Sequence, residues 1–184
     1  VSFLPIPKTV GEMKTKPTQH AVRTLNSSGL QPDIVIARSK SKLDKRRKEK
    51  ISFFCNIAPE CVISAPDISS IYDVPINFEK ENLGDILSDR LDIKKGGKKT
   101  PAFTKWNTFA KKVHSVESEV NIAVVGKYFE TGDFVLSDAY LSVIEALKYS
   151  AYHLGKKPVL HWLSSEKFED KKKLSGLKKY DGVL

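Results

Sequence analysis

The sequence predicts an α/β protein built on parallel β-sheets. Short apolar runs alternate with longer amphipathic segments, which is typical of strands joined by crossover helices. The runs within 33–38 and 61–64 are continuous rather than alternating, as in strands that are covered on both faces of a sheet. We therefore expect a doubly wound, Rossmann-like sheet that binds its ligands at the carboxyl ends of the strands.

The first helix is defined by a proline, an apolar face and a glycine. We expect this helix over residues 17–28. Pro17 suits the first helical position, where its missing N–H is not needed. Val22 and Leu25 fall on one helical face, and Gly29 provides a residue that commonly ends a helix.

Two further helical segments are predicted in the first half of the chain. Residues 42–54 have the composition of a basic helix. The apolar residues that can share one side of it are Leu43, Ile51 and Phe54. Residues 69–92 predict two helical pieces that are broken at Pro75, because proline interrupts the hydrogen bonds of a helix interior.

The middle of the chain contains a candidate linker. Lysines, glycines and a proline at 94–101 favour an exposed loop. Residues 102–116 show an amphipathic pattern, which we interpret as a helix that connects two domains. A strand over 120–125 then opens a new unit.

The second unit repeats the strand–helix–strand order of the first. Its helix can be capped by Ser137 or Asp138 and ended by Gly155. The remaining segments are a strand at 159–163, a Lys-rich exposed helix or loop at 166–179 and a strand at 181–184.

The composition is that of a globular protein with an excess of positive charge. The chain is 40% hydrophobic and 29% charged, with a net charge of +9. No apolar run approaches the roughly 18 residues that span a membrane, so no membrane partner is expected. The cations form separate clusters without interleaved aromatic residues, which argues against a nucleic-acid partner. Cys55 and Cys61 lack metal-ligand spacing, which favours reduced thiols in a cytoplasmic protein over a disulfide.

Two lysines mark the first candidate site. Lys14 and Lys16 stand directly before the first helix, where unpaired N–H groups and the helix dipole also favour an anion such as a triphosphate. A solvated Lys-rich loop is the alternative interpretation. Arg38 and Asp67 both follow predicted strands, so we expect them at the ligand-binding edge of the sheet.

The motifs around these residues resemble those of the CTP synthase family. The longest of them is Gly11-Glu12-Met13-Lys14-Thr15-Lys16-Pro17-Thr18-Gln19. Further motifs follow in the family's order: Arg38-Ser39, Lys50-Ile51 with Phe54-Cys55, Val62-Ile63-Ser64 with Asp67-Ile68-Ser69-Ser70-Ile71-Tyr72 and Val74-Pro75, Val125-Gly126-Lys127-Tyr128, and Asp138-Ala139-Tyr140 with Ser142-Val143 and Glu145-Ala146-Leu147. The resemblance covers most of the chain apart from residues 90–118.

The resemblance implies three segments. Residues 1–92 would be the C-terminal part of an amidoligase domain, with a doubly wound, Rossmann-like sheet of the P-loop type. Residues 93–118 would be an interdomain linker with a helix. Residues 119–184 would be the start of a class I glutamine amidotransferase domain with a flavodoxin-like α/β fold. Because the chain begins with Val1 and ends in an apolar run, we expect an internal piece of a longer protein.

The resemblance also implies a site for UTP, or for CTP as a feedback inhibitor. The residues that match the family's positions are Lys14, Thr15, Lys16, Pro17, Thr18, Gln19 and Lys50. The lysines would attract the phosphates, and Gln19 would supply directional hydrogen bonds. By its chemistry alone, Lys50 is one cation among many on a basic helix.

The resemblance implies an ATP site as well. Pro66, Asp67 and Ile68 match the segment that holds the adenine, largely through the backbone. We would expect lysine where Pro66 stands; proline removes an amide contact but keeps a carbonyl contact. Arg38 would pack on the adenine plane, although a salt bridge at the strand end is an equal alternative.

The implied activity is that of a C–N ligase in pyrimidine biosynthesis, which aminates UTP to CTP with ATP and with ammonia from glutamine. No catalytic residue or metal ligand is expected in this chain: the Mg²⁺ ligands would lie upstream and the glutaminase nucleophile downstream, so the chain alone should be inactive. The implied enzyme is a cytoplasmic homotetramer with GTP as an effector. The alternatives are a non-catalytic nucleotide-binding or regulatory module and a basic nucleic-acid-binding protein.

Overall fold

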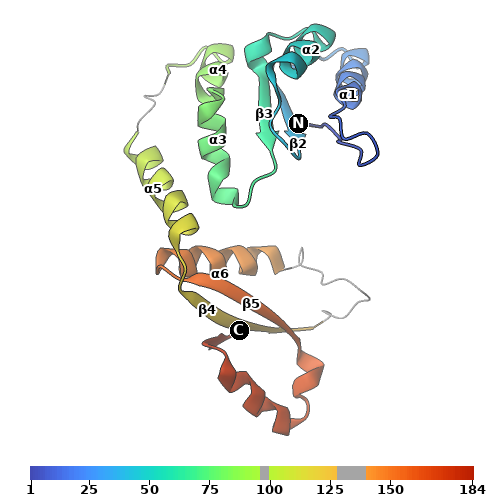
Figure 1. Ribbon diagram of the computed structural model, residues 1–184. Coiled ribbons are helices and arrows are strands. Elements are labelled where there is room, and N and C mark those ends of the chain that lie inside the picture. The colour runs from blue at the N-terminus through green and yellow to red at the C-terminus, as the bar shows by residue number, and fades with distance from the viewer. Residues whose placement is uncertain (96–99, 128–139) are drawn as a thin grey trace. The chain divides into compact units, whose positions relative to one another are not determined.

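The structure, a computed structural model, describes residues 1–95, 100–127 and 140–184 (Figure 1). It confirms the predicted α/β class, because both of its sheets consist of parallel strands joined by helical segments. The chain divides into two compact units, Val1–Thr104 and Lys105–Leu184. This boundary falls inside the segment 93–118; the interpretation of that segment as a linker stays a prediction.

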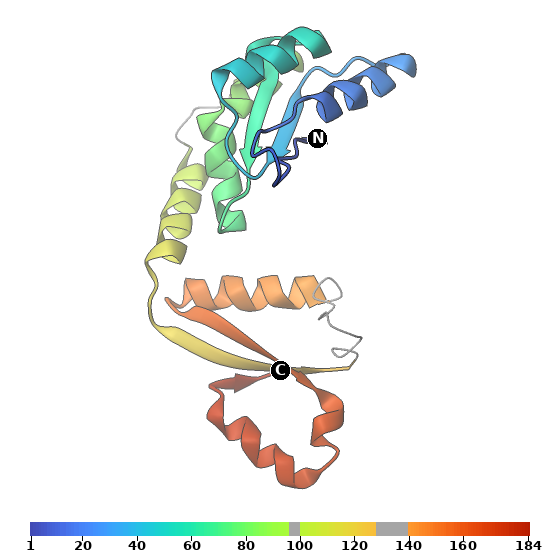
Figure 2. The ribbon, with the colours of Figure 1, turned by 45° about the vertical axis from the view of Figure 1, so that its right-hand side comes forward.

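The first unit is built on a sheet with the strand order β1-β2-β3 (Figure 2). Its strands are β1 (Ser2–Phe3), β2 (Val35–Ser39) and β3 (Val62–Pro66). Its helices are α1 (Lys16–Ser27), α2 (Lys45–Cys55), η1 (Pro59–Cys61), η2 (Ile71–Asp73), α3 (Val74–Lys80) and α4 (Leu83–Arg90). The register pairs Ser2 with Ala37, so the loops that follow the strands leave from one edge.

The core of this unit lies between the sheet and the helices α1 and α2. Its fully or almost fully buried apolar residues are Leu4, Met13, Val22, Val35, Ala37, Leu43, Ile51, Cys55 and Val62. The strands are buried on both faces, as the continuous apolar runs predicted. Cys55 and Cys61 are both free thiols, which agrees with the prediction of reduced cysteines.

The first helix follows the sequence signals closely at its ends, whereas α2 begins at Lys45 and not at residue 42 as predicted. Pro17 lies in the first turn of α1, and Gly29 adopts a φ of 80°, the left-handed conformation that glycine tolerates best. The helix α2 begins after Asp44, whose carboxylate accepts a hydrogen bond from the Arg47 amide at 2.7 Å.

The predicted apolar side of α2 is wrong at one position. Phe54 is 56% exposed and meets Phe53 edge-on, whereas Cys55 is buried beside Ile51. Ile51 and Cys55 are four residues apart and therefore centre the buried face, so Phe54 falls at its margin. Leu43 is buried as predicted, but it lies in the loop before the helix.

The predicted break at Pro75 is also wrong. Pro75 lies in the first turn of α3, where a proline costs no hydrogen bond. The helical segment breaks instead at Asn82, which has a φ of 55°. The proline therefore starts a helix at a position where it was predicted to interrupt one.

Glu81 ties three elements of the first unit together at this break. Its side chain is only 6% exposed and forms ion pairs with Lys48 of α2 and with Lys42 at 3.5 Å. The same carboxylate accepts a hydrogen bond from the amide of Ser64 in β3. Burial alone would raise the pKa of Glu81, but the bonds from Lys48 and Ser64 outweigh it and hold that pKa below its ordinary value.

The second unit has the strand order β5-β4-β6. Its strands are β4 (Glu119–Gly126), β5 (Lys157–Ser164) and β6 (Gly182–Val183), and its helices are α6 (Leu141–His153), η4 (Ser165–Phe168) and η5 (Lys171–Lys179). In chain order this is 2-1-3, an order that a flavodoxin-like sheet also contains. The Lys-rich segment is a largely exposed 3₁₀ helix.

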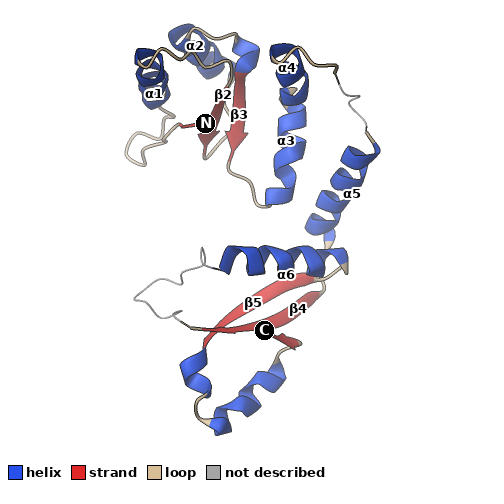
Figure 3. Ribbon diagram, turned by 180° about the vertical axis from the view of Figure 1, so that it is seen from behind, coloured by secondary structure: helices blue, strands red, loops and turns tan. Residues whose placement is uncertain are grey.

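The helix α5 (Pro101–Ser115) crosses the boundary between the units, and its later part packs on α6 (Figure 3). The rings of Phe109 and Tyr149 are 5.1 Å apart, and the Lys112 ammonium donates to the carbonyl of His153. The predicted caps at Ser137 or Asp138 and part of the predicted loop 94–101 lie outside the described residues.

We expect Glu81→Ala to lower the free energy of unfolding by about 2–3 kcal/mol, because the Ser64 amide and the Lys48 ammonium would lose their shared partner. Chemical denaturation at pH 7 measures this loss. The matched control is Glu49→Ala, which removes an exposed carboxylate paired with Lys45 at 3.8 Å and should cost less than about 0.5 kcal/mol.

The same loss should depend on pH. Because the pKa of Glu81 is lower in the folded chain than in the unfolded chain, its stabilising contribution is present above its unfolded value, near 4.5, and is lost as the pH falls through the folded value. The difference between the wild type and Glu81→Ala should therefore shrink below that pH. An equal loss in Glu49→Ala, or a difference that does not change with pH, would contradict this role.

Candidate functional site

The loop between β1 and α1 presents charged side chains because the residues that alternate with them face the core. Met13 and Thr15 are buried at 7% and 5% exposure, and they alternate with Glu12 and Lys14, which face outward. Gly11, with a φ of 66°, permits the preceding turn. The Lys14 amide then donates a hydrogen bond to the Pro5 carbonyl at 2.9 Å, which closes the loop. This alternation places the Glu12 and Lys14 side chains where a ligand can reach them.

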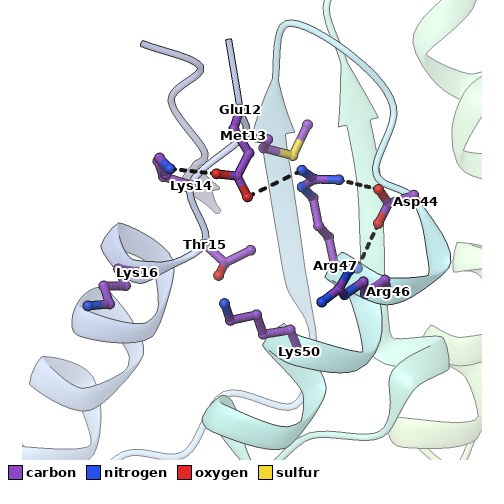
Figure 4. Close-up of a pocket in the computed structure, with 9 residues that line it drawn as sticks. All are labelled: Glu12, Met13, Lys14, Thr15, Lys16, Asp44, Arg46, Arg47 and Lys50. Atoms are coloured by element: carbon purple, nitrogen blue, oxygen red, sulfur yellow. Dashed lines mark hydrogen bonds and ion pairs between the residues drawn. The ribbon is translucent and has the colours of Figure 1, made fainter. Parts of the chain in front are cut away.

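A cavity of about 630 Å³ opens beside this loop and the start of α2; we call it the loop cavity (Figure 4). Its lining residues are Glu12, Met13, Lys14, Thr15, Lys16, Asp44, Arg46, Arg47 and Lys50. Five of them are cations and two are carboxylates, so the cavity carries a net positive charge. It has the size and the charge to accept a polyanion.

A chain of ion pairs crosses the loop cavity. The Lys14 ammonium donates to Glu12 at 2.7 Å, and the other oxygen of Glu12 lies 3.8 Å from the Arg47 guanidinium. Arg47 also forms an ion pair with Asp44 (Figure 4). The hydrogen bond from Lys14 and its charge, with help from Arg47 and Lys50, hold the pKa of Glu12 below its ordinary value.

The two lysines of the motif line the same cavity but point differently. Lys14 points toward Glu12, whereas Lys16 extends along the outer side of α1, away from Glu12 and Lys50 (Figure 4). Lys16 and Lys50 form no ion pair within the described part of the chain. The structure therefore brings Lys14, Lys16 and Lys50 to one cavity, with two of these ammonium groups unpaired there.

The last three residues of the motif shape the loop and do not line the cavity. Pro17 occupies the first turn of α1, and Gln19 donates a hydrogen bond to the Thr15 hydroxyl at 3.1 Å. Thr18 is fully buried, and its hydroxyl accepts from Ser2 of β1 at 2.9 Å. These contacts fix α1 against the sheet and hold Thr15 in place.

A second cavity, of about 350 Å³, lies where β2 and β3 end; we call it the strand-end cavity. Its lining residues are Arg38, Ala65, Pro66, Asp67, Ile68, Ile71, Val74, Asn77 and Phe78. Its lining is mostly apolar, with one guanidinium and one carboxylate. All four residues that sequence reasoning placed at an ATP site line this cavity together.

Arg38 is held rigidly at the rim of the strand-end cavity. Its guanidinium donates to the carbonyls of Ala65 and Pro66 at 2.8 and 3.0 Å and pairs with Asp67 at 2.8 Å. The predicted salt bridge at the strand end is therefore present, and the same guanidinium still lines the cavity. The Pro66 carbonyl already accepts one bond, and the Asp67 amide donates to Ser39.

Sequence reasoning missed several lining residues of both cavities. In the loop cavity these are Glu12, Met13, Asp44, Arg46 and Arg47; in the strand-end cavity they are Ala65, Ile71, Val74, Asn77 and Phe78. Asp44 and Arg47 carry a usable signal, because a capping aspartate three residues before an arginine places both at a helix start. Asn77 and Phe78 carry none, since their place depends on how α3 packs.

A parallel α/β sheet with two ligand-sized cavities near the carboxyl ends of its strands has the architecture of the nucleotide-binding α/β domains. The sequence profile of the CTP synthase N-terminus matches residues 1–93. The chain belongs to the CTP synthase family.

Relatives from bacteria and archaea extend this similarity over the whole chain. The CTP synthase of Nostoc punctiforme is 42% identical over 184 residues, all of this chain and 32% of the relative. The CTP synthase of Thermococcus gammatolerans is 42% identical over 183 residues, and that of Methanocaldococcus jannaschii is 39% identical over 190 residues, 34% of its length. The chain thus spans about a third of the length of the relatives it matches.

No helix of residues 1–95, 100–127 and 140–184 is both long enough and apolar enough to cross a membrane. Across the same ranges, no group of three or more His, Cys, Asp or Glu side chains is placed to hold a metal ion.

We expect Thr18→Val to lower the free energy of unfolding by about 1 kcal/mol, because it leaves the Ser2 hydroxyl without its buried partner while keeping the side-chain shape. Thr24→Val is the matched control on the same helix, since the Thr24 hydroxyl is exposed and bonds only to the carbonyl of His20. Chemical denaturation compares the two variants. Equal stability of both would show that the Thr18 hydroxyl does not hold α1 to the sheet.

Proposed function

We propose that the chain is part of a CTP synthase and forms the substrate-nucleotide pockets of its amidoligase domain. The observation that carries this proposal is the loop cavity, which is cationic and is built by the family's longest motif. In the proposed reaction, ATP phosphorylates the O4 atom of the uracil ring of UTP. Ammonia derived from glutamine then attacks C4, and phosphate leaves with the former O4 oxygen.

The loop cavity is the proposed site for the triphosphate of UTP, and of CTP as feedback inhibitor. Lys14, Lys16 and Lys50 provide ammonium groups for the phosphates, and Thr15 lines the cavity beside them. Pro17, Thr18 and Gln19 belong to the proposed site as the residues that fix the loop's shape. The role of these residues is to bind and orient the nucleotide so that its base reaches the reacting groups.

The strand-end cavity is the proposed site for the adenine of ATP. Its apolar lining suits a planar base, and the Arg38 guanidinium is fixed at the rim, where it can lie against a ring. The Asp67 amide already donates to the Ser39 carbonyl, so the Ile68 amide is the candidate backbone donor to the edge of the base. Pro66 contributes through its carbonyl alone.

The rest of the proposed activity depends on parts of the enzyme beyond these cavities. Mg²⁺ would neutralise the charge of the nucleotide phosphates when it is bound, and we assign its ligands to the remainder of the enzyme. The second unit is proposed to begin the glutamine amidotransferase domain, and GTP is proposed as its effector. We also propose a cytoplasmic homotetramer, in which Lys14 and Lys16 can serve a site completed by a neighbouring subunit.

We expect Lys14→Ala combined with Lys16→Ala to weaken the binding of both UTP and CTP by about 100-fold or more in the complete enzyme, because two charge-assisted phosphate contacts are lost. The KM for UTP and the inhibition constant for CTP measure this effect. Lys45→Ala is the matched control, since Lys45 is an exposed cation of α2 that does not line the loop cavity. Unchanged binding of both nucleotides in the double variant would refute the assignment of this loop.

Arg38→Ala should raise the KM for ATP by about tenfold and leave the KM for UTP unchanged, because it removes the planar group at the rim of the strand-end cavity. Arg38→Lys should recover little, since lysine lacks the planar fork. Arg23→Ala removes an exposed arginine that lines neither cavity and is the control. An equal rise for UTP would show that Arg38 acts through the fold of the sheet edge.

A further inference from the structure

The loop cavity already contains an anion of its own. The two carboxylate oxygens of Glu12 are shared between Lys14, at 2.7 Å, and Arg47, at 3.8 Å (Figure 4). A carboxylate between an ammonium and a guanidinium occupies the kind of position that a phosphate takes in a cationic site. Neither Glu12 nor Arg47 has a role in the proposed function so far.

We propose that Glu12 is an internal counter-ion of the loop cavity, which the triphosphate of UTP or CTP displaces in order to bind both Lys14 and Arg47. The inference rests on the proposed function and deepens it. It adds Arg47 as a phosphate-binding residue and assigns Glu12 a role that opposes binding. Both residues would then set the affinity for the nucleotide without taking part in the chemistry.

The geometry of Arg47 supports this role. One guanidinium nitrogen pairs with Asp44, whose carboxylate also caps α2 through the Arg47 amide. The hydrogen bond from the Arg47 amide, together with the Arg47 charge, holds the pKa of Asp44 below its ordinary value, so Asp44 stays ionised at neutral pH. The other nitrogen faces Glu12 at the longer distance of 3.8 Å. Asp44 therefore fixes the guanidinium from one side and leaves the opposite side for a ligand.

The exposure of Glu12 makes displacement easy. Its side chain is 57% exposed, so the carboxylate can rotate into solvent without opening the core. Ion pairs at such an exposed position contribute little, whereas a triphosphate brings several charged oxygens to the same cations. The neighbouring Lys16, Arg46 and Lys50 form no recorded ion pair within the described residues and also attract the incoming anion.

The test is calorimetric binding of UTP, CTP and uridine to the complete enzyme without ATP and glutamine. Glu12→Gln should raise the affinity for UTP and CTP by about two- to fivefold, because the competing charge is removed while the side-chain size is kept. Arg47→Ala should weaken both by about tenfold. Uridine lacks the phosphates, so its binding should change in neither variant.

Matched controls come from the same helix. Glu49→Gln removes an exposed carboxylate and Lys45→Ala an exposed cation, and neither residue lines the loop cavity. Both controls should leave the affinity for UTP within twofold of the wild type. In the double variant Glu12→Gln/Arg47→Ala, the gain seen for Glu12→Gln alone should be reduced, because one of the two cations that Glu12 shields is absent.

Failure of this inference can be told apart from failure of the proposed function. If Lys14→Ala with Lys16→Ala weakens UTP but Glu12→Gln leaves its affinity unchanged, the counter-ion role is wrong and the proposed site stands. Weaker UTP binding in Glu12→Gln would also overturn the inference, because Glu12 would then help to hold the ligand. If the lysine variant binds UTP normally, the site itself is wrong.

Discussion

The parallel pairing of β2 with both of its neighbours is the constraint on which the candidate sites depend. It continues past the strands themselves: the Leu4 amide donates to Arg38, the Ser39 hydroxyl to the Leu4 carbonyl, and the Asp67 amide to Ser39. Because these bonds join all three strand ends, the loops that carry the charged residues leave from one edge. The two cavities share no lining residue, so each is formed by its own set of these loops and helix starts.

Charge is distributed differently at the two cavities, and the difference matches the chemistry proposed for each. In the strand-end cavity the one guanidinium bonds to two carbonyls and a carboxylate, so this group is held in place before a ligand binds. The rest of that cavity's lining is mostly apolar. The loop cavity is lined by more cations than carboxylates, so only some of its cations form ion pairs. A planar base suits the first arrangement, and a flexible polyanion suits the second, because desolvated apolar walls favour rings and unpaired cations favour phosphates.

Much of the fold followed from local signals in the sequence. Pro17 and Gly29 bounded α1, the continuous apolar runs marked β2 and β3 as buried parallel strands, and the second unit's strand–helix–strand order was evident without tertiary information. Local signals were wrong where two structural roles look alike in sequence. A proline can either interrupt a helix or begin one, and Pro75 begins one. Phe54 has the spacing of a buried residue, but it lies at the edge of the buried helical face and is exposed.

The sequence by itself determined the family motif, the cationic character of its loop and the residues that stand at strand ends, because these depend on spacing along the chain. Only the tertiary structure decided which of them meet a cavity. Thr18 belongs to the motif but is buried against Ser2, whereas Arg47 lies outside the motif and reaches Glu12 from another helix. Such contacts join residues far apart in sequence, so their distances are set by how α1 and α2 pack on the sheet and not by any local pattern.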